Sequence, residues 1–291
     1  MSQLEPTLHV DIPWVKITPS EFKSVNCLVC GENNYRDVKP LTINGYDFRL
    51  VQCADDKMFW LNPQPGETFL RSLYSEPYFK VDVDHPGLVS QVGLRDGTEE
   101  EHARRTDIAK LRMQEWLSVG MEPYTPSGEK RKFLEVGGGC GYQQKAAQEA
   151  GWETIGLDIS DYCVLECRKK GLEVRQMDLP RFAQNLPPEI FDLIAMYDVI
   201  EHLPNPREYL EVVRRLLKKE GYLTTRLPIF SENEIPQSHI AGNHLWHFNR
   251  PSLEKLLEQE GFEVFVAFKS GVTPFGEDKP AQNMTFFTRK I

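Results

Sequence analysis

The sequence predicts an α/β protein in which residues 130–291 form a doubly wound, mainly parallel sheet of seven strands. Short apolar runs alternate with helix-period segments along this region. A glycine-rich turn joins a buried strand at 132–136 to a helix and then to a strand at 153–158 that ends in Asp158. The last two strands are expected to pair as an antiparallel hairpin across 270–281. The other expected strands are 172–177, 191–197, 221–227, 262–269 and 282–289.

We predict that residues 1–68 form a small ribbon-like appendage. It ends at 61–66, where prolines and a glycine interrupt regular secondary structure. The pair Asn44-Gly45 suits a tight turn between two strands. Two cysteines stand at the spacing of a zinc knuckle, and a third follows the hairpin, but an aspartate stands where a fourth is expected. These four residues are Cys27, Cys30, Cys53 and Asp56. Either they bind a metal, or packing holds the ribbon and the cysteines are free and buried.

We predict that residues 69–129 form a helical cap and a linker before the first strand of the larger sheet. A helix is expected over 98–117, with Thr98 as its N-cap and Glu101 at the capping-box position. The proline- and glycine-containing stretch at 122–128 reads as a linker.

Composition excludes several classes of protein. The chain of 291 residues is 40% hydrophobic, but no run approaches the ~18 apolar residues that span a bilayer. The first residues lack the pattern of a secretory signal, and six cysteines in a chain this long do not suggest a disulfide framework. A cytoplasmic protein is therefore expected. The net charge of −9 argues against a nucleic-acid substrate. The sequence does not predict an oligomeric state.

The glycine spacing indicates which nucleotide the turn binds. Glycines stand at 137, 139 and 141, but Tyr142 occupies the place of the last glycine in a dinucleotide fingerprint. Glu135, two residues before the first glycine, would repel a pyrophosphate. Its carboxylate could instead hold the cationic amino end of S-adenosylmethionine, directly or through water. The turn therefore predicts a methyl-donor loop.

Together, the loop, Asp158, the strand at 191–194 and the block at 198–206 resemble the class I S-adenosylmethionine-dependent methyltransferases, of the type with an N-terminal zinc-ribbon-like segment. The resemblance covers roughly the last 160 residues. It implies that Gly137, Gly139 and Gly141 let the backbone approach the donor, and that Asp158 accepts hydrogen bonds from both ribose hydroxyls. It further implies that Asp178 takes the adenine amino group, that Tyr197 lies near the methionine portion, and that Tyr74, Tyr78 and Phe79 line the donor or acceptor pocket.

The cluster Asp198-x-x-Glu201-His202 allows three interpretations. Two carboxylates and an imidazole on one face could bind a divalent cation, as a similar cluster does in the ubiquinone O-methyltransferases that this block resembles. Alternatively, His202 is a general base that takes a proton from an acceptor hydroxyl. In the third interpretation the cluster caps and turns the chain, with no chemical role.

Three further histidines, His239, His244 and His247, follow the expected fifth strand, where the resembled family places acceptor-binding loops. A histidine with a pKa near neutrality suits proton removal from a hydroxyl. We prefer His244 to His239 for this role, whereas His247 also suits bracing the helix that starts near Pro251. Cys163 and Cys167 are four apart on an expected helix and are interpreted as buried small side chains.

The expected function is transfer of a methyl group from S-adenosylmethionine to an oxygen, nitrogen or carbon of a small molecule. A sugar or another hydroxylated metabolite is the preferred acceptor. The alternative is a non-catalytic module that binds S-adenosylmethionine or a partner protein. A nicotinamide oxidoreductase is disfavoured by Tyr142.

Overall fold

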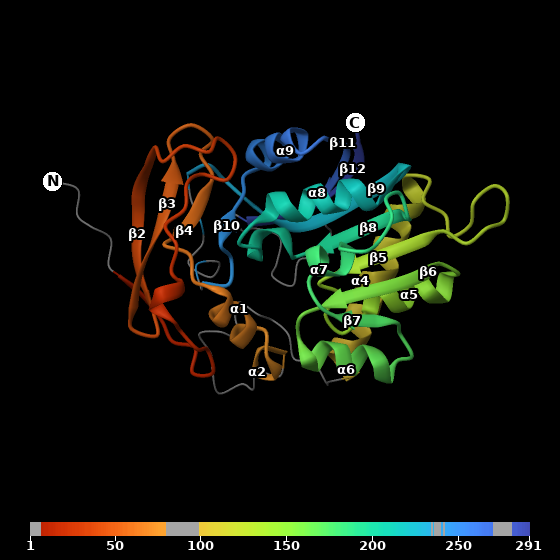
Figure 1. Ribbon diagram of the computed structural model, residues 1–291, viewed down its shortest axis with the longest axis horizontal. Coiled ribbons are helices and arrows are strands. Elements are labelled where there is room, and N and C mark those ends of the chain that lie inside the picture. The colour runs from red at the N-terminus through yellow and green to blue at the C-terminus, as the bar shows by residue number, and fades with distance from the viewer. Residues whose placement is uncertain (1–6, 80–98, 234, 236–239, 241, 270–280) are drawn as a thin grey trace.

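The computed structural model describes residues 7–79, 99–233, 235, 240, 242–269 and 281–291. Within these residues the chain forms two β-sheets side by side, joined by two short helices (Figure 1). The larger sheet has seven strands in the order β11-β12-β9-β8-β5-β6-β7. The predicted fold class is therefore confirmed.

The strands of the larger sheet closely match the predicted ones. They are β5 (Lys132–Val136), β6 (Glu153–Asp158), β7 (Val174–Gln176), β8 (Phe191–Tyr197), β9 (Leu217–Phe230), β11 (Phe262–Lys269) and β12 (Ala281–Lys290). Every residue of β8 is buried, as expected for a central parallel strand covered on both faces. β12 runs antiparallel to both β9 and β11, which confirms the predicted final hairpin. β9 is longer than predicted at both ends, because Leu217 already pairs with Phe191 of β8 and residues 228–230 still pair with β12.

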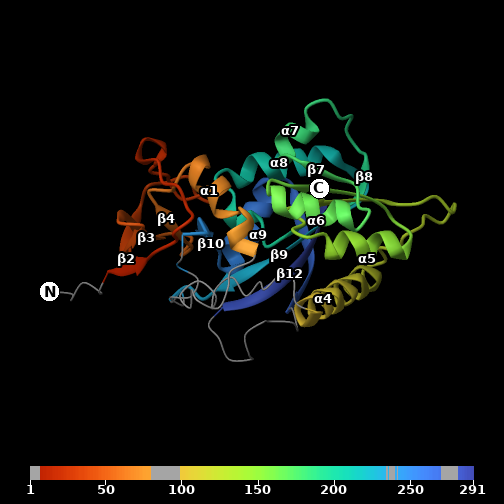
Figure 2. The same ribbon diagram turned by 90° about the horizontal axis from the view of Figure 1, so that it is seen from below.

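Helices cover both faces of the larger sheet, with α4 and α5 on one side and α7 and α8 on the other (Figure 2). α8 shows how the sequence dictates this packing: Pro206 stands at its first position, and Leu210, Val213 and Leu216 form one buried stripe. The helices are α4 (Glu99–Ser118), α5 (Tyr142–Ala150), α6 (Asp161–Lys169), α7 (Leu179–Ala183), α8 (Pro206–Leu216) and α9 (Arg250–Gln259).

The predicted helix at 98–117 is α4, although its expected N-cap, Thr98, lies outside the described residues. Glu101 forms ion pairs with Arg104 and Arg105, at 2.6 and 2.8 Å, further along the same helix. Its carboxylate thus pairs with two guanidinium groups. These bind it more strongly than the single backbone N–H of a capping box would.

The smaller sheet comprises, among the described residues, β1 (Leu8–Val10), β2 (Tyr35–Ile43), β3 (Tyr46–Cys53), β4 (Phe59–Asn62) and β10 (Trp246–His247). The predicted turn joins β2 to β3, with Asn44 and Gly45 at φ angles of 48° and 79°. β10 was not predicted. It pairs antiparallel with β4, so a segment that follows β9 completes the N-terminal sheet. The boundaries near residues 68 and 129 remain a prediction from sequence.

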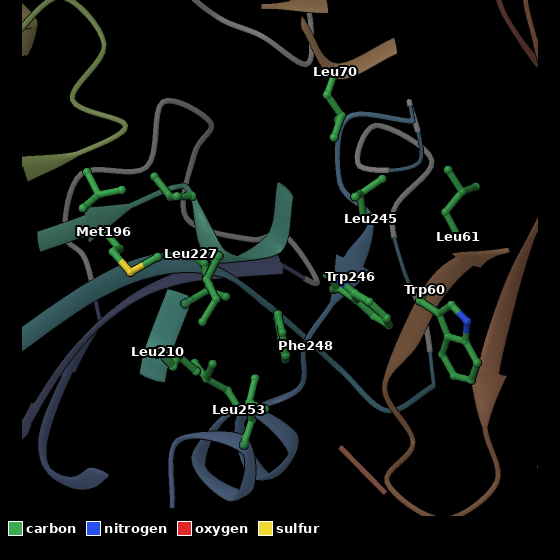
Figure 3. Close-up of a cluster of buried hydrophobic side chains, with 14 of the residues drawn as sticks. Trp60, Leu61, Leu70, Met196, Leu210, Leu227, Leu245, Trp246, Phe248 and Leu253 are labelled. Atoms are coloured by element: carbon green, nitrogen blue, oxygen red, sulfur yellow. The ribbon is translucent and has the colours of Figure 1, made fainter. Parts of the chain in front are cut away.

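One hydrophobic cluster spans both sheets (Figure 3). Trp60 and Leu61 of β4 and Trp246 of β10 share it with Met196 of β8 and Leu253 of α9. Two helices lie between the sheets: α1 (Glu67–Leu73) adds Phe69, Leu70 and Leu73 to this cluster, and α2 (Glu76–Phe79) adds Tyr78 and Phe79. The placement of the N-terminal sheet therefore depends on a shared core as well as on strand pairing. No described helix is long and apolar enough to cross a membrane.

Candidate functional site

The carboxyl ends of β5, β6 and β8 point toward α1 and the N-terminal sheet (Figure 1). In open α/β sheets, ligands bind at this edge. The predicted donor-site residues lie here, at the ends of β5, β6 and β8 and in the segments that follow β5 and β7.

The glycine loop connects β5 to α5 by a tight turn. Gly137, Gly139 and Gly141 have φ angles of 65°, 54° and 75°, a conformation that favours glycine. A Cβ atom on Gly137 would lie 2.6 Å from a methyl group of Val199. Gly137 N–H also donates to the carbonyl of Leu157 in β6 at 2.7 Å, which fixes the loop against that strand.

Glu135 lies beneath this loop and is 4% exposed. Its Oε2 accepts a hydrogen bond from the backbone N–H of Gln144, at 3.0 Å, in the first turn of α5. Burial raises the pKa of Glu135 to about 8, while the positive charge of Arg112 acts in the opposite direction. The carboxyl group is thus mostly protonated and uncharged at pH 7. A nearby cation would favour its ionised form.

Asp158 ends β6 and organises both neighbouring loops. Its Oδ2 accepts from Gly139 N–H at 2.8 Å, and its Oδ1 accepts from Ser160 N–H at 2.8 Å. Burial raises the pKa of Asp158 to about 6, so the carboxylate is mostly ionised at pH 7. Each oxygen of an ionised carboxylate has two lone pairs, so each can accept a further hydrogen bond from a ligand. Asp158 therefore fits a ribose while it also stabilises the start of the α6 segment.

A cavity of about 620 Å³ opens beyond β6 and β7. This volume is in the range typical of small-molecule sites. Ile159 and Ser160 after β6, Gln176 at the end of β7, and Tyr74 after α1 contribute to its wall. Ile159 directly follows Asp158 in the chain, so the cavity begins one residue beyond the acid, whereas Asp158, Glu135 and the glycine loop do not line it.

Two other predicted donor residues have clear structural roles. Asp178 is the N-cap of α7, where its Oδ1 accepts from Arg181 N–H at 2.9 Å. Tyr197 ends β8, but its hydroxyl accepts from the Trp116 indole N–H at 2.8 Å and donates to Thr224 at 3.4 Å, on the α4 face. The Tyr197 hydroxyl is therefore part of the packing of α4, and only its ring or backbone could face the donor.

A charged group that the sequence analysis missed lies beside Glu135. Arg112 of α4 stacks over the Tyr197 ring, with its guanidinium carbon 4.1 Å from the ring centroid. Asp198 pairs with Arg226 of β9 and lies 3.9 Å from Arg112. The Nε–H of Arg112 is buried and has no hydrogen-bond partner among the described residues. A single arginine on a helix has no distinguishing sequence signal, so only the packing of α4 shows this group.

His202 lies in a 3-10 turn (Ile200–His202) after β8, with its ring 4.7 Å from that of His244. Its Nδ1 is 2.7 Å from the carbonyl of Asn243, so Nδ1 carries the hydrogen and Nε2 has the free lone pair. Burial lowers the pKa of His202, which favours the neutral ring, the form that can accept a proton.

Glu201 is 1% exposed, and neither of its carboxylate oxygens accepts a hydrogen bond from any described residue. Burial raises its pKa well above the usual range, and the nearby charge of Asp198 acts in the same direction. The hydroxyl of Tyr74, whose ring packs against His202, is also buried without a partner in the described part of the chain. Buried polar groups generally have a partner, so these atoms are available to a ligand or to ordered water.

The predicted cation group of Asp198, Glu201 and His202 needs a correction. The Asp198 carboxylate faces two arginines, whereas ligand atoms of Glu201, His202 and His244 lie within 4.8 Å of one another. Asp198 directly follows β8 and has a φ of 55°, a left-handed conformation that periodicity along a helix does not anticipate.

The remaining predicted histidines have different surroundings. His247 is 1% exposed in β10, opposite Phe59 of β4, and its ring packs against Phe230 and His244. This position favours the bracing role over a catalytic one. His239 lies outside the described residues. Cys163 and Cys167 are buried on α6, as predicted.

The four residues of the predicted metal site do come together in the N-terminal part. Ligand atoms of Cys27, Cys30, Cys53 and Asp56 all lie within 4.8 Å of one another, in a partly buried pocket. Their detailed geometry is described below.

Comparisons with known proteins agree with this architecture. The sequence model of a methyltransferase domain matches residues 101–265, more than half of the chain. A ubiquinone biosynthesis O-methyltransferase of Methylococcus capsulatus is 33% identical over 97 residues, which cover 31% of this chain and 40% of that protein. One of Alkalilimnicola ehrlichii is 29% identical over 146 residues, covering 43% of this chain and 57% of that protein. The chain thus spans about half the length of these relatives.

A solved protein of Pyrococcus horikoshii OT3 shares the fold, with a TM-score of 0.50 and 16% identity over 67% of this chain and 94% of that chain. The matched domain begins within α4 and ends within β11, so it includes the glycine loop and every strand end described above. The chain belongs to the family of class I S-adenosylmethionine-dependent methyltransferases.

Proposed function

We propose that this protein transfers a methyl group from S-adenosylmethionine to a small hydroxylated molecule. The observation that carries the proposal is the convergence of the glycine loop, Glu135 and Asp158 at one edge of the sheet. Dinucleotide chemistry fits less well, because Tyr142 stands at the start of α5 where a pyrophosphate loop has glycine.

The residues of this edge supply complementary groups for each part of the donor. Asp158 accepts hydrogen bonds from the ribose hydroxyls, and Asp178 accepts one from the adenine amino group. Glu135 faces the ammonium group of the methionine portion, and Arg112 faces its carboxylate. When bound, the donor supplies an electrophilic methyl group on a sulfonium ion. The protein's task is then to place a nucleophile in line with that methyl group.

His202 is the proposed general base. Its Nδ1–H is held by the Asn243 carbonyl, so its Nε2 can take a proton from an acceptor hydroxyl. As the acceptor oxygen bonds to the methyl carbon, the carbon–sulfur bond breaks and its electron pair remains on sulfur. His244 packs against His202 and is the second residue proposed on the acceptor side.

The acceptor class is inferred from the groups around His202. Glu201 and Tyr74 both bury polar atoms without partners among the described residues, which suits a molecule with several hydroxyl groups. The relatives named ubiquinone biosynthesis O-methyltransferases are consistent with a hydroxyl acceptor. Methylation at oxygen is therefore proposed ahead of nitrogen or carbon.

The test of the donor site is calorimetric titration of the protein with S-adenosylhomocysteine and, separately, with NAD. We expect binding of the first ligand alone, weakened at least tenfold by Asp158→Ala, because two charge-assisted hydrogen bonds are lost. Asp107→Ala, which removes an exposed carboxylate of α4, is the matched control and should bind as the unaltered protein does. NAD binding, or equal affinity in Asp158→Ala, would contradict the proposed donor site.

A bound divalent cation at Glu201, His202 and His244 is the competing role for these histidines. The two roles predict opposite responses to a chelator. If His202 is the base, turnover persists in EDTA and is lost in His202→Gln, while S-adenosylhomocysteine still binds. Turnover that stops in EDTA and returns with Mg²⁺ or Mn²⁺, which thiolate sites do not favour, would assign His202 to the cation instead.

A further inference from the structure

The N-terminal sheet contains a group of three thiols and one carboxylate that the proposed methyl transfer does not use. Cys27 and Cys30 lie on one turn before β2, Cys53 ends β3, and Asp56 follows in the next turn. The Sγ atoms of Cys30 and Cys53 are 3.6 Å apart. Asp56 Oδ2 lies 3.7 Å from Cys27 Sγ and 4.0 Å from Cys53 Sγ.

These separations match the edges of a tetrahedral zinc site. With Zn–S bonds of ~2.3 Å and a Zn–O bond of ~2.0 Å, the edges of the tetrahedron are ~3.8 Å between sulfurs and ~3.5 Å between sulfur and oxygen. A disulfide is a poor alternative for Cys30 and Cys53, because it needs a separation of ~2.05 Å. The residues present therefore fit a zinc ion without rearrangement of the fold.

The backbone around the group also suits thiolate ligands. The N–H groups of Asp55 and Asp56 both point at Cys53 Sγ, at 3.4 and 3.3 Å. On the other side, Gly31 at a φ of 79° turns the chain back, and its N–H donates to the Cys27 carbonyl. Donors directed at a sulfur stabilise the negative charge that a metal-bound thiolate carries.

Side chains of the methyltransferase domain hold this group from outside. The Asp56 Oδ1 atom, which is the oxygen not directed at the sulfurs, accepts from Lys255 of α9 at 2.7 Å. Asn249, the N-cap of α9, donates to the Asp56 carbonyl at 2.9 Å. Arg207 at the start of α8 donates to the carbonyl of Leu28, between the two cysteines of the turn, at 2.7 Å.

We propose that Cys27, Cys30, Cys53 and Asp56 bind Zn²⁺ tetrahedrally, and that Asp56 shares its carboxylate between the metal and Lys255. The metal then fastens the N-terminal sheet to α9. Three thiolates and one carboxylate around Zn²⁺ leave a net charge of −2, which Lys255 partly neutralises. This inference goes beyond the proposed function and does not depend on it.

Metal content and Co²⁺ spectra of the full-length protein test the site. After dialysis we expect about one Zn²⁺ per chain in the unaltered protein, because structural zinc is retained tightly. Reconstitution with Co²⁺ should give the visible absorption of a tetrahedral site with three thiolates. Less than ~0.1 metal per chain in folded protein, with no tetrahedral Co²⁺ spectrum, would overturn the proposal.

Variants of one turn test whether the carboxylate is a ligand. Asp56→Ala should weaken Co²⁺ binding at least tenfold, whereas Asp56→Cys should keep the metal and raise the thiolate-to-cobalt absorption by about one third, from three sulfurs to four. Asp55→Ala is the matched control, because it keeps the backbone donor and removes only a neighbouring carboxylate. An Asp56→Ala spectrum and affinity equal to those of Asp55→Ala would show that Asp56 is not a ligand.

Hydrogen exchange tests the connection to the methyltransferase domain. Lys255→Met should retain zinc. Amide exchange should become faster in the turn at 53–57 and at the start of α9, because the ion pair that joins these two segments, Lys255–Asp56, is lost. Unchanged exchange in both segments would refute the fastening role and leave the metal site standing by itself.

Discussion

Glu135 provides a quantitative test of how the donor site works. With a pKa of about 8, this carboxyl group is about 90% protonated at pH 7 in the free protein. An ammonium group beside it favours the ionised form, so binding of S-adenosylhomocysteine should lower the pKa and release a proton. Since the free protein must lose this proton, affinity should rise with pH until about pH 8.

The expected magnitude follows from the two titrations at this edge of the sheet. Between pH 6.5 and 7.5, release of the Glu135 proton should raise the affinity about eightfold. Asp158, with a pKa of about 6, should contribute only about 1.3-fold over the same interval, because it is already mostly ionised. The steep part of the profile is therefore assigned to Glu135.

Calorimetry in two buffers of different ionisation enthalpy measures the proton directly. At pH 7 we expect release of about 0.9 proton per ligand from Glu135, and about 0.1 from Asp158. Glu135→Gln keeps the size of the side chain and a potential acceptor for Gln144 N–H, so it should still fold. Its proton release should fall to about 0.1, and its affinity should become nearly independent of pH. Equal proton release in both proteins would refute the pairing of Glu135 with the donor.

Three further predictions follow from the packing around the site. Arg112→Met should weaken S-adenosylhomocysteine about tenfold by calorimetry but leave 5′-methylthioadenosine unchanged, because the latter lacks the carboxylate; equal loss for both would contradict this role. Tyr197→Phe removes the acceptor of the buried Trp116 N–H and should lower the free energy of unfolding by about 1–3 kcal/mol in urea titrations, and no loss would show that the hydrogen bond is unimportant. Trp246→Ala should cost about 3–5 kcal/mol in the same assay, because Trp246 packs between both sheets, and a cost below ~1 kcal/mol would contradict a shared core.

Much of the fold could be predicted because its signals are local. A buried run such as 191–197, a positive-φ glycine turn and an Asn-Gly hairpin each express the conformational preference of a few adjacent residues. The order of a strand, a glycine loop, a helix and a second strand ending in Asp158 then predicted the seven-stranded α/β fold correctly. The same local reasoning placed Asp158 at the end of its strand and the two cysteines on one turn.

Features that depend on distant segments could not be predicted in this way. β10 is only Trp246–His247, too short for a periodic pattern, and it exists because β4 offers an edge to pair with. Arg112 is unremarkable in sequence and gains significance only where α4 crosses Tyr197. Asp198 was grouped with Glu201 by spacing, but a left-handed backbone turns it toward Arg226.

The most direct test of the central claim is a crystal structure of the protein with S-adenosylhomocysteine. We predict the ribose hydroxyls within hydrogen-bond distance of Asp158, the amino group beside Glu135 and the adenine toward Asp178. The thioether sulfur should face the side of the site where His202 presents Nε2. A ligand bound away from the glycine loop, or with its ribose not in contact with Asp158, would contradict this account.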